Sequence, residues 1–295
     1  MNKYIITCSS TADLSKEYLD SRNIPYVCFH FTMDGVEYPD DLGVTVSYKE
    51  FYKKISDGAT PTTSQINSED YERFFKKYLD QGLDIIHITL SSGISGTYNS
   101  ALIAADNLKD KYPKQQLTII DSLSASAGYG LLVAYAKDNL DNRMDYDDNV
   151  EWIMNHRLNV QSHFFSTDLT SFFRGGRISR SSAIFGTALN ICPVIDINSE
   201  GKLIPRSKAR GKKKAMHQIV LNMVEHAKNG INYDGKCFIS ESDCLDDAKA
   251  VAAEIEELFP KLKGKIVITS IGTVIGSHTG PGTVALFFMG DKRQD

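Results

Sequence analysis

The sequence lacks several features that mark whole classes of protein. Its 295 residues contain no apolar run approaching the ~18 residues of a membrane-spanning helix, and the first residues do not form the apolar core of a signal peptide. The five cysteines form no C-x-x-C pair, and an odd number does not suggest a disulfide framework. We therefore expect a cytoplasmic protein with free thiols and no integral membrane segment.

An excess of positive charge is also absent. The formal net charge is -4 at pH 7 and the pI is about 6.0. The densest basic run, from Arg210 to Lys214, is short. Nothing in this charge balance indicates a nucleic-acid partner.

Motifs for nucleotides and metals are missing as well. The chain has no G-x-x-x-x-G-K-[ST] run, and its histidines and cysteines show no metal-ligand spacing. The segment from Gly280 to Ala285 matches G-x-G-x-x-A, but a strand-like apolar segment follows it where a helix is required. We predict no metal site and no cofactor.

What is present is an ordinary globular composition, 42% hydrophobic and 24% charged, in an alternating pattern of strands and helices. Strands are predicted at 3–7, 84–90 and 117–120 and helices at 47–56, 68–79, 101–108 and 127–140, with an extended loop at 59–65. This alternation predicts a parallel sheet with helices on both faces. We expect an N-terminal α/β/α domain over residues 1–160.

The pattern changes near residue 160. A hairpin around 198–201, strands at 236–240 and 265–269, and helices at 213–228 and 246–258 indicate an α+β unit with a mainly antiparallel sheet. The predicted fold is thus a two-domain α/β protein whose second domain spans 161–295. The groove between the domains is a natural binding site.

The most informative stretch is the loop between the strand at 84–90 and the helix at 101–108. It contains Ser92, Ser95 and Thr97 but no lysine or arginine, and it precedes a helix N-terminus. Free backbone N–H groups and the helix dipole favour an anion there, and the lack of basic residues favours a carboxylate over a phosphate. Ligands of parallel sheets bind beyond the carboxyl ends of the strands. Hydroxyl and carboxylate side chains at several such ends are therefore expected to converge on one crevice, namely Ser9, Ser10, Thr63, Ser92, Ser95 and Asp121.

The same loop permits a second interpretation. Gly93-Ile94-Ser95-Gly96-Thr97 resembles the G-x-S-x-G turn of a serine hydrolase, except that Thr97 replaces the last glycine. An acyl-ester hydrolase with Ser95 or Ser92 as nucleophile is therefore an alternative.

Several short motifs, taken in order, resemble the DegV family. Their order and spacing match over nearly the whole chain. They are Thr7-Cys8-Ser9-Ser10-Thr11-Ala12-Asp13-Leu14, Thr62-Thr63-Ser64-Gln65, Ser91-Ser92-Gly93-Ile94-Ser95-Gly96-Thr97-Tyr98, Asp121-Ser122, Gly175-Gly176-Arg177-Ile178-Ser179, Ala209-Arg210-Gly211 and His278-Thr279-Gly280-Pro281-Gly282.

The resemblance implies a long-chain fatty acid held between two α/β domains, with its carboxylate near Thr63 and Ser95. It also implies a carrier that catalyses nothing alone and presents the acid to a separate fatty acid kinase, which forms an acyl phosphate. A lipid-sensing regulatory protein is a further alternative. The ligand-binding residues expected on this basis are Thr63, Ser64, Ser92, Ser95, Gly96 and His278. The chain departs from the family pattern at Cys8, where an aspartate is usual, and at Ile66, where a proline is common.

Basic residues of the second domain are candidates for the kinase-docking surface. Arg174 and Arg177 lie in a glycine-rich segment, and Arg210 begins the basic run. Fixed positive charge near the pocket mouth would attract a partner that carries ATP. The alternative is that these arginines make ordinary surface ion pairs.

Overall fold

The first half of the chain is built on a parallel sheet. The computed structural model describes residues 3–179 and 191–295. Four strands lie in the order β2-β1-β6-β7, all parallel. They are β1 (Tyr4–Ser9), β2 (Tyr26–Val27), β6 (Asp84–Thr89) and β7 (Leu117–Asp121). As predicted, the central strand β6 is completely buried.

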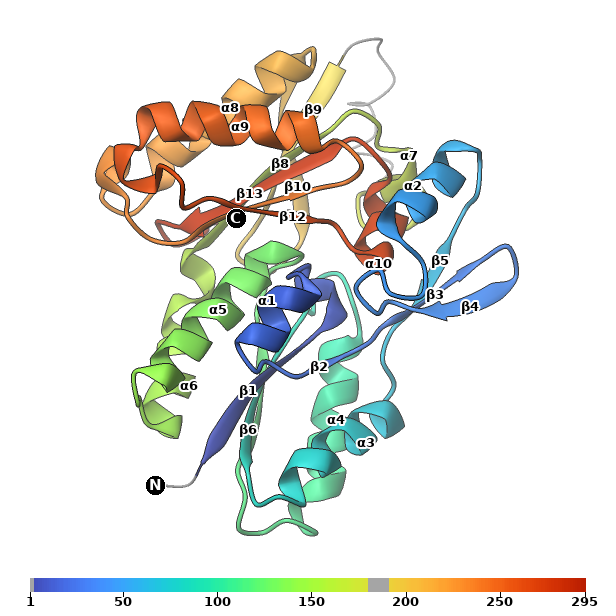
Figure 1. Cartoon of the computed structure of the whole chain (residues 1–295), viewed down its shortest axis with the longest axis vertical. Coiled ribbons are helices and arrows are strands. Elements are labelled where there is room, and N and C mark those ends of the chain that lie inside the picture. Colours follow the sequence, from blue (N-terminus) through green and yellow to red (C-terminus); the bar gives the residue numbers. More distant parts are fainter. Residues whose placement is uncertain (1–2, 180–190) are drawn as a thin grey trace.

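Helices cover both faces of this sheet (Figure 1). The helices α3 (Ser68–Leu79) and α4 (Thr97–Lys109) pack on one face, and α5 (Ala127–Asp141) packs on the other face with α6 (Tyr146–His156) outside it. The short helix α1 (Lys16–Ser21) follows β1. The aromatic side chains of α3 face the core, since Tyr71, Phe74 and Phe75 are buried and Tyr78 is partly buried. The α/β/α prediction is confirmed.

A small antiparallel sheet lies beside the parallel one. Its strands are β3 (His30–Met33), β4 (Val36–Pro39) and β5 (Thr62–Ser64), in the order β4-β3-β5. The helix α2 (Tyr48–Ser56) begins after Ser47, whose side chain accepts a hydrogen bond from the Glu50 N–H. The segment predicted as an extended loop at 59–65 is thus extended, but part of it is a hydrogen-bonded strand.

The second half of the chain forms a six-stranded mixed sheet. The strand order is β10-β9-β8-β13-β11-β12, and only β11 and β12 are parallel. The strands are β8 (Val160–Ser166), β9 (Ile191–Ile197), β10 (Leu203–Arg210), β11 (Cys237–Glu241), β12 (Val267–Ser270) and β13 (Thr283–Met289). The predicted hairpin joins β9 and β10. The prediction of a mainly antiparallel sheet is confirmed.

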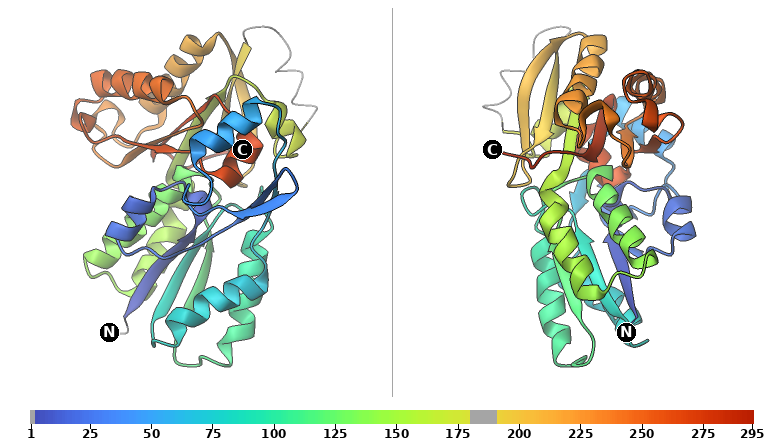
Figure 2. Two further views of the ribbon diagram at one scale, coloured as in Figure 1. Left: turned by 45° about the vertical axis from the view of Figure 1, so that its right-hand side comes forward. Right: turned by 90° about the vertical axis from the view of Figure 1, so that its left-hand side faces the viewer.

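The two halves are stacked so that α5 lies between the two sheets (Figure 2). The helices α8 (Lys212–His226) and α9 (Leu245–Leu258) lie side by side over the outer face of the six-stranded sheet. Two short helices, α7 (Thr170–Arg174) and α10 (Thr273–Thr279), pack against each other near the small antiparallel sheet. In the described part of the chain no helix is both long and apolar enough to span a bilayer. All five cysteines are free thiols.

Two buried carboxylates from the first half hold the start of α10. Asp13 accepts a hydrogen bond from the Gly272 N–H at 2.9 Å. Asp40 accepts hydrogen bonds from the Thr273 N–H at 3.2 Å and the Thr273 hydroxyl at 2.6 Å. Burial raises the pKa of both carboxyl groups. The N-terminus of a second-half helix is therefore fixed by first-half side chains.

The β9–β10 hairpin makes a second close contact between the halves. The Ser91 hydroxyl donates a hydrogen bond to the Gly201 carbonyl oxygen at 2.9 Å. A Cβ atom on Gly93 would lie 2.6 Å from the Glu200 carbonyl oxygen, so only glycine allows this approach. The loop after β6 is thereby held against the tip of the hairpin.

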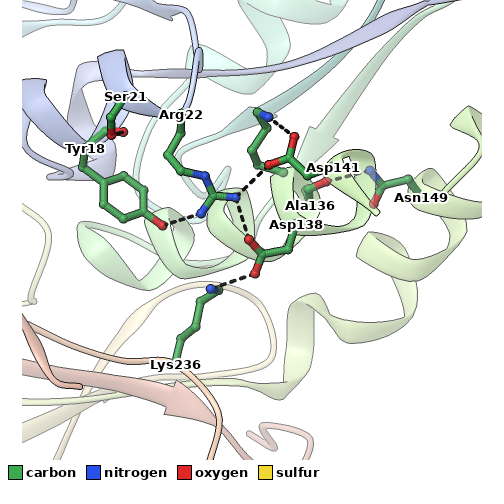
Figure 3. Close-up of polar contacts among 9 residues, drawn as sticks. Tyr18, Ser21, Arg22, Ala136, Asp138, Asp141, Asn149 and Lys236 are labelled. Carbon is green, nitrogen blue, oxygen red and sulfur yellow. Dashed lines mark hydrogen bonds and ion pairs between the residues drawn. The ribbon is translucent and has the colours of Figure 1, made fainter. Parts of the chain in front are cut away.

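An ion-pair network ties the halves together on the side of α1 and α5 (Figure 3). Asp138 on α5 accepts from Arg22 at 2.6 Å and lies 2.7 Å from the Lys236 ammonium nitrogen of the second half. Arg22 also contacts Asp141, at 3.2 Å. The three side chains joined at Asp138 are 23 to 31% exposed, so solvent screens them only in part.

We predict that Asp138→Ala lowers the free energy of unfolding by about 1 to 3 kcal/mol, because it leaves two half-buried cations without their shared partner. Urea denaturation measures the change. Asp106→Ala is the matched control, since its pair with Lys109 is 63 to 69% exposed and should cost under about 0.5 kcal/mol. Equal losses in the two variants would contradict a special role for the Asp138 network.

Candidate functional site

A cavity of about 300 Å³ lies between the two halves. Its wall is mainly apolar and is built from both halves. The apolar lining residues are Phe29, Leu90, Ile94, Ala125, Phe164, Phe172, Ile197, Leu203, Ile271, Val274, Ile275, Ala285 and Phe287. The polar lining residues are Thr63, Gln65, Ser95, Ser126, Arg177, His278, Thr279 and Thr283. At the predicted groove between the halves the structure therefore has a mainly apolar cavity with a few polar groups.

Ser95 reaches the cavity from the loop between β6 and α4. Its hydroxyl accepts a hydrogen bond from the Thr97 N–H at 3.3 Å, in the first turn of α4. Gly96 is the residue that precedes the helix, and it provides no side-chain cap. The remaining N–H groups and the positive end of the helix dipole make this end of the cavity favourable for an anion.

Thr63 and His278 meet in the cavity wall from opposite halves of the chain. The Thr63 hydroxyl and His278 Nε2 are 2.8 Å apart. Burial and the charge of Arg177 lower the pKa of His278 to about 4. The imidazole is therefore neutral at pH 7. The second nitrogen of the ring, Nδ1, faces Gly175, and a Cβ atom on that glycine would lie 2.1 Å from it.

Arg177 supplies the positive charge that the loop after β6 lacks. Its guanidinium donates to the Ile94 carbonyl oxygen at 3.2 Å and to the Gly175 carbonyl oxygen at 2.6 Å. Burial lowers the pKa of Arg177, but an arginine still carries its charge at neutral pH. Within residues 3–179 and 191–295 no carboxylate forms an ion pair with it. This end of the cavity therefore holds a cation whose charge no carboxylate of those described residues balances.

The cavity wall includes only some of the residues predicted to form the site. Thr63, Ser95 and His278 line it together. Ser64 is exposed on β5 and points away, because successive side chains of a strand alternate between faces. Ser92 and Gly96 are exposed and lie outside the wall.

The predicted docking arginines also separate. Arg177 lines the cavity, whereas Arg174 at the end of α7 and Arg210 at the end of β10 are exposed. Sequence spacing placed Arg174 and Arg177 in one group, but the turn after α7 directs one outward and the other inward.

The convergence predicted for the strand ends is only partly found. Ser10 is buried and its hydroxyl accepts from the Phe29 N–H, while Ser9 bonds to Tyr129. Asp121 accepts from the backbone N–H groups of Ser92 and Leu123. These three side chains do not line the cavity, because other partners already occupy them. Ser9 bonds to the hydroxyls of Thr11 and Tyr129, whereas Ser10 and Asp121 accept from backbone N–H groups.

The geometry offers little to a serine nucleophile in the loop after β6. Among the described residues, no histidine or carboxylate is hydrogen-bonded to the hydroxyl of Ser92 or Ser95, which a general base requires. The nearby His278 is bonded to Thr63 instead. In the same described residues no group of three His, Cys, Asp or Glu side chains is placed to hold a metal ion.

Four polar lining residues were not predicted as site residues: Gln65, Ser126, Thr279 and Thr283. Gln65 donates to the Ser100 hydroxyl, and its Oε1 would lie 2.4 Å from a Cβ atom on Gly96. The T-T-S-Q motif contains both Thr63 and Gln65, and this shared motif could have identified Gln65 as a site residue. Thr279 likewise lies beside His278 in a quoted motif. Ser126 and Thr283 gave no signal, since single serines and threonines near strand and helix ends are common.

Taken together, the cavity suits an elongated apolar molecule with one anionic end. The anion would contact Arg177, Ser95 and the N-terminus of α4. Thr63, which is hydrogen-bonded to His278, adds a further hydroxyl. The other polar groups of the described wall are the Gln65 amide and the hydroxyls of Ser126, Thr279 and Thr283, and the rest of the wall is apolar.

Comparison with known proteins agrees with this arrangement. The model of the family described as "Uncharacterised protein, DegV family" matches residues 3–291. A DegV domain-containing protein of Clostridium perfringens is 38% identical over 295 residues, which is all of both chains.

Solved structures give the same fold. A DegV family protein from Thermus thermophilus, described by its fatty acid binding, has a TM-score of 0.85 and 27% identity over 98% of this chain and 100% of its own. The Streptococcus pneumoniae fatty acid kinase (Fak) B3 protein, loaded with linoleic acid, has a TM-score of 0.83 over 99% of this chain and 100% of its own. At 21% identity, that likeness shows the fold alone.

We predict that the ring of His278 titrates near pH 4 in the folded protein, because burial and Arg177 disfavour its charged form. Histidine ring signals in NMR spectra measure the midpoint, and Arg177→Gln should raise it. The unfolded chain binds this proton at about pH 6.5. The free energy of unfolding should therefore fall as the pH is lowered from 6.5 towards 4. A midpoint near 6.5 in the folded protein would contradict the buried, neutral imidazole.

Proposed function

The chain belongs to the DegV family, and we propose that it binds a long-chain fatty acid in the cavity between its two halves. The acid lies with its carboxylate at Arg177, Ser95 and Thr63 and with its acyl chain along the apolar wall. In this proposal Arg177 binds the carboxylate of the ligand and does not contact the kinase.

The observation that carries this proposal is a guanidinium that has no carboxylate partner among the described residues and lies at one end of an apolar cavity. A partly buried charge without a counter-ion is unfavourable, so a ligand that brings one negative charge is favoured at that place. A guanidinium and hydroxyl donors satisfy a carboxylate well. A doubly charged phosphate would bring more charge than the single cation of the described wall balances.

The acyl chain supplies most of the binding free energy. Each buried methylene contributes about 0.8 kcal/mol, so fifteen of them contribute on the order of 10 kcal/mol before the costs of association and ordering. A few polar contacts are then sufficient, and their main effect is to set the orientation of the ligand.

The fatty acid binding named for the Thermus thermophilus protein supports this assignment, because that protein shares both fold and 27% of its residues with this chain. The Streptococcus pneumoniae protein of the same fold is named as part of a fatty acid kinase. That name supports a second step of the proposal, in which this chain presents its fatty acid to a separate kinase and the kinase forms the acyl phosphate.

The exposed arginines are the proposed contacts for that kinase. Arg174 lies three residues before Arg177, at the end of α7, and Arg210 starts the basic run at the end of β10. Both are exposed. Fixed positive charge on the surface would steer a partner that carries ATP.

The first test concerns the carboxylate. Thr63→Ala and Ser95→Ala should each weaken binding of a fatty acid by about 1 to 3 kcal/mol, because each leaves a buried acceptor short of a donor. Arg177→Gln should weaken it at least as much. Calorimetric titration gives the affinities.

Two comparisons complete this test. Ser64→Ala removes a hydroxyl next to Thr63 that points away from the cavity, so we expect no change. The methyl ester of the same acid should bind more weakly than the free acid, since it lacks the charge that Arg177 and the helix terminus favour. Unchanged affinity in all three cavity variants, or equal binding of the ester, would refute the site.

The second test separates presentation from binding. Arg174→Ala and Arg210→Ala should leave fatty acid affinity unchanged and reduce acyl phosphate formation severalfold when a fatty acid kinase is added at low salt. Lys53→Ala, on an exposed cation of α2, is the control for a general loss of charge. Full acyl phosphate formation by both variants would place the docking surface elsewhere. Labelling of Ser95 or Ser92 by a serine-directed phosphonate would instead favour the hydrolase.

A further inference from the structure

Ser126 has a backbone conformation that serines rarely adopt. Its φ is 54° and its ψ is −148°, immediately before α5. This lies near a region that is essentially restricted to glycine and costs on the order of 1 to 3 kcal/mol for other residues. Strain of this kind persists only where the surrounding structure enforces it.

A capping role does not explain this strain. A serine that caps a helix has an extended backbone and accepts a hydrogen bond from the first turn, but the Ser126 side chain accepts none from α5. Instead its hydroxyl donates to Asp13 Oδ2 at 2.5 Å and lies 3.2 Å from the Ser240 hydroxyl. The Ser240 hydroxyl is in turn hydrogen-bonded to the Thr269 hydroxyl, at 3.1 Å. The strained turn thus directs the Ser126 hydroxyl into a buried network of hydrogen-bonded side chains between the two halves.

Ser126 also lines the cavity, at a distance from the carboxylate end. Asp13 binds both Ser126 and the Gly272 N–H, at the start of α10, whereas His278 lies in the last turn of α10. Six residues of helix separate Gly272 from His278, or about 9 Å at 1.5 Å per residue. Around Ser126 the wall is apolar, with Ala125, Phe287 and Ile271 in it. The cavity wall also contains Thr279 and Thr283, but the Ser126 hydroxyl lies among these apolar side chains, beside the middle of a chain anchored at Arg177.

We propose that Ser126 is a specificity-determining residue, which accepts a hydrogen bond from a hydroxyl group carried in the middle of the fatty acid chain. The ligand class of the cavity then includes mid-chain hydroxy fatty acids. This inference rests on the proposed function, because the carboxylate must be held at Arg177 for a mid-chain group to reach Ser126.

The hydrogen-bond roles at Ser126 favour a donor on the ligand. The Ser126 proton is directed to Asp13, which leaves a lone pair on the hydroxyl oxygen for a further donor. An unsubstituted chain still binds, since Asp13 and Ser240 already satisfy the hydroxyl. The same separation excludes a nucleophilic role, because the carbonyl carbon of an anchored acid lies at the other end of the cavity.

The test compares the affinities of stearate, of stearate hydroxylated on carbon eight, ten or twelve, and of stearate hydroxylated next to the carboxylate. Each is measured by calorimetry on the full chain and on Ser126→Gly. Glycine adopts the Ser126 backbone conformation without strain, so this variant loses the hydroxyl and keeps the fold. Ser124→Ala, in the same turn but outside the cavity wall, is the matched control.

For at least one mid-chain isomer, we expect Ser126→Gly to lower the ratio of its affinity to that of stearate by about three- to tenfold. The ratio for the isomer hydroxylated next to the carboxylate, and all ratios in Ser124→Ala, should not change. Unchanged ratios for every mid-chain isomer, with stearate still bound, would overturn this inference alone. Failure of the unaltered chain to bind stearate would overturn the proposed function as well.

Discussion

The site depends on the hydrogen bonds that two buried carboxyl groups accept from the start of α10. Asp13 and Asp40 belong to the first half and bind the backbone of Gly272 and Thr273 in the second. The last turn of the same helix carries His278 to Thr63. Because the helix is a rigid rod, fixing its first turn fixes the position of the imidazole and of one wall of the cavity. The strained Ser126 uses the second oxygen of Asp13, so the same carboxylate also orients the middle of the cavity.

Much of the fold follows from local sequence patterns. The strand β6 and the helix α3 were predicted from the local residue pattern, and the change to a mainly antiparallel sheet after residue 160 from the hairpin and strand patterns there. Local patterns succeed there because each element buries the face that its own residues make apolar. The strand at β5 was predicted only as an extended loop, since its pairing with β3 is a long-range contact.

The site was less predictable than the fold, for the same physical reason. Thr63 and Ser95 lie in motifs that point to them, but the inward direction of Arg177 follows from the turn after α7, and Ser126 is strained by a partner distant in sequence. The chain has Cys8 where the family pattern usually has an aspartate, a possible hydrogen-bond acceptor. Cys8 is instead fully buried among apolar side chains, while Asp13 and Asp40 provide the acceptors. A sequence motif records residue type, whereas orientation depends on contacts between its parts.

The pairing of Asp13 with Gly272 also has a consequence for synthesis. The two residues are 259 positions apart. At about 5–20 residues per second a ribosome needs on the order of tens of seconds to add the chain between them. During that interval the parallel sheet can form, while Phe29 and Leu90 of the future cavity wall face solvent and Asp13 and Asp40 have no helix to cap. The newly made first half thus presents an uncovered apolar face, and the ligand space is complete only after β13, which carries Ala285 and Phe287 of its wall, has left the ribosome.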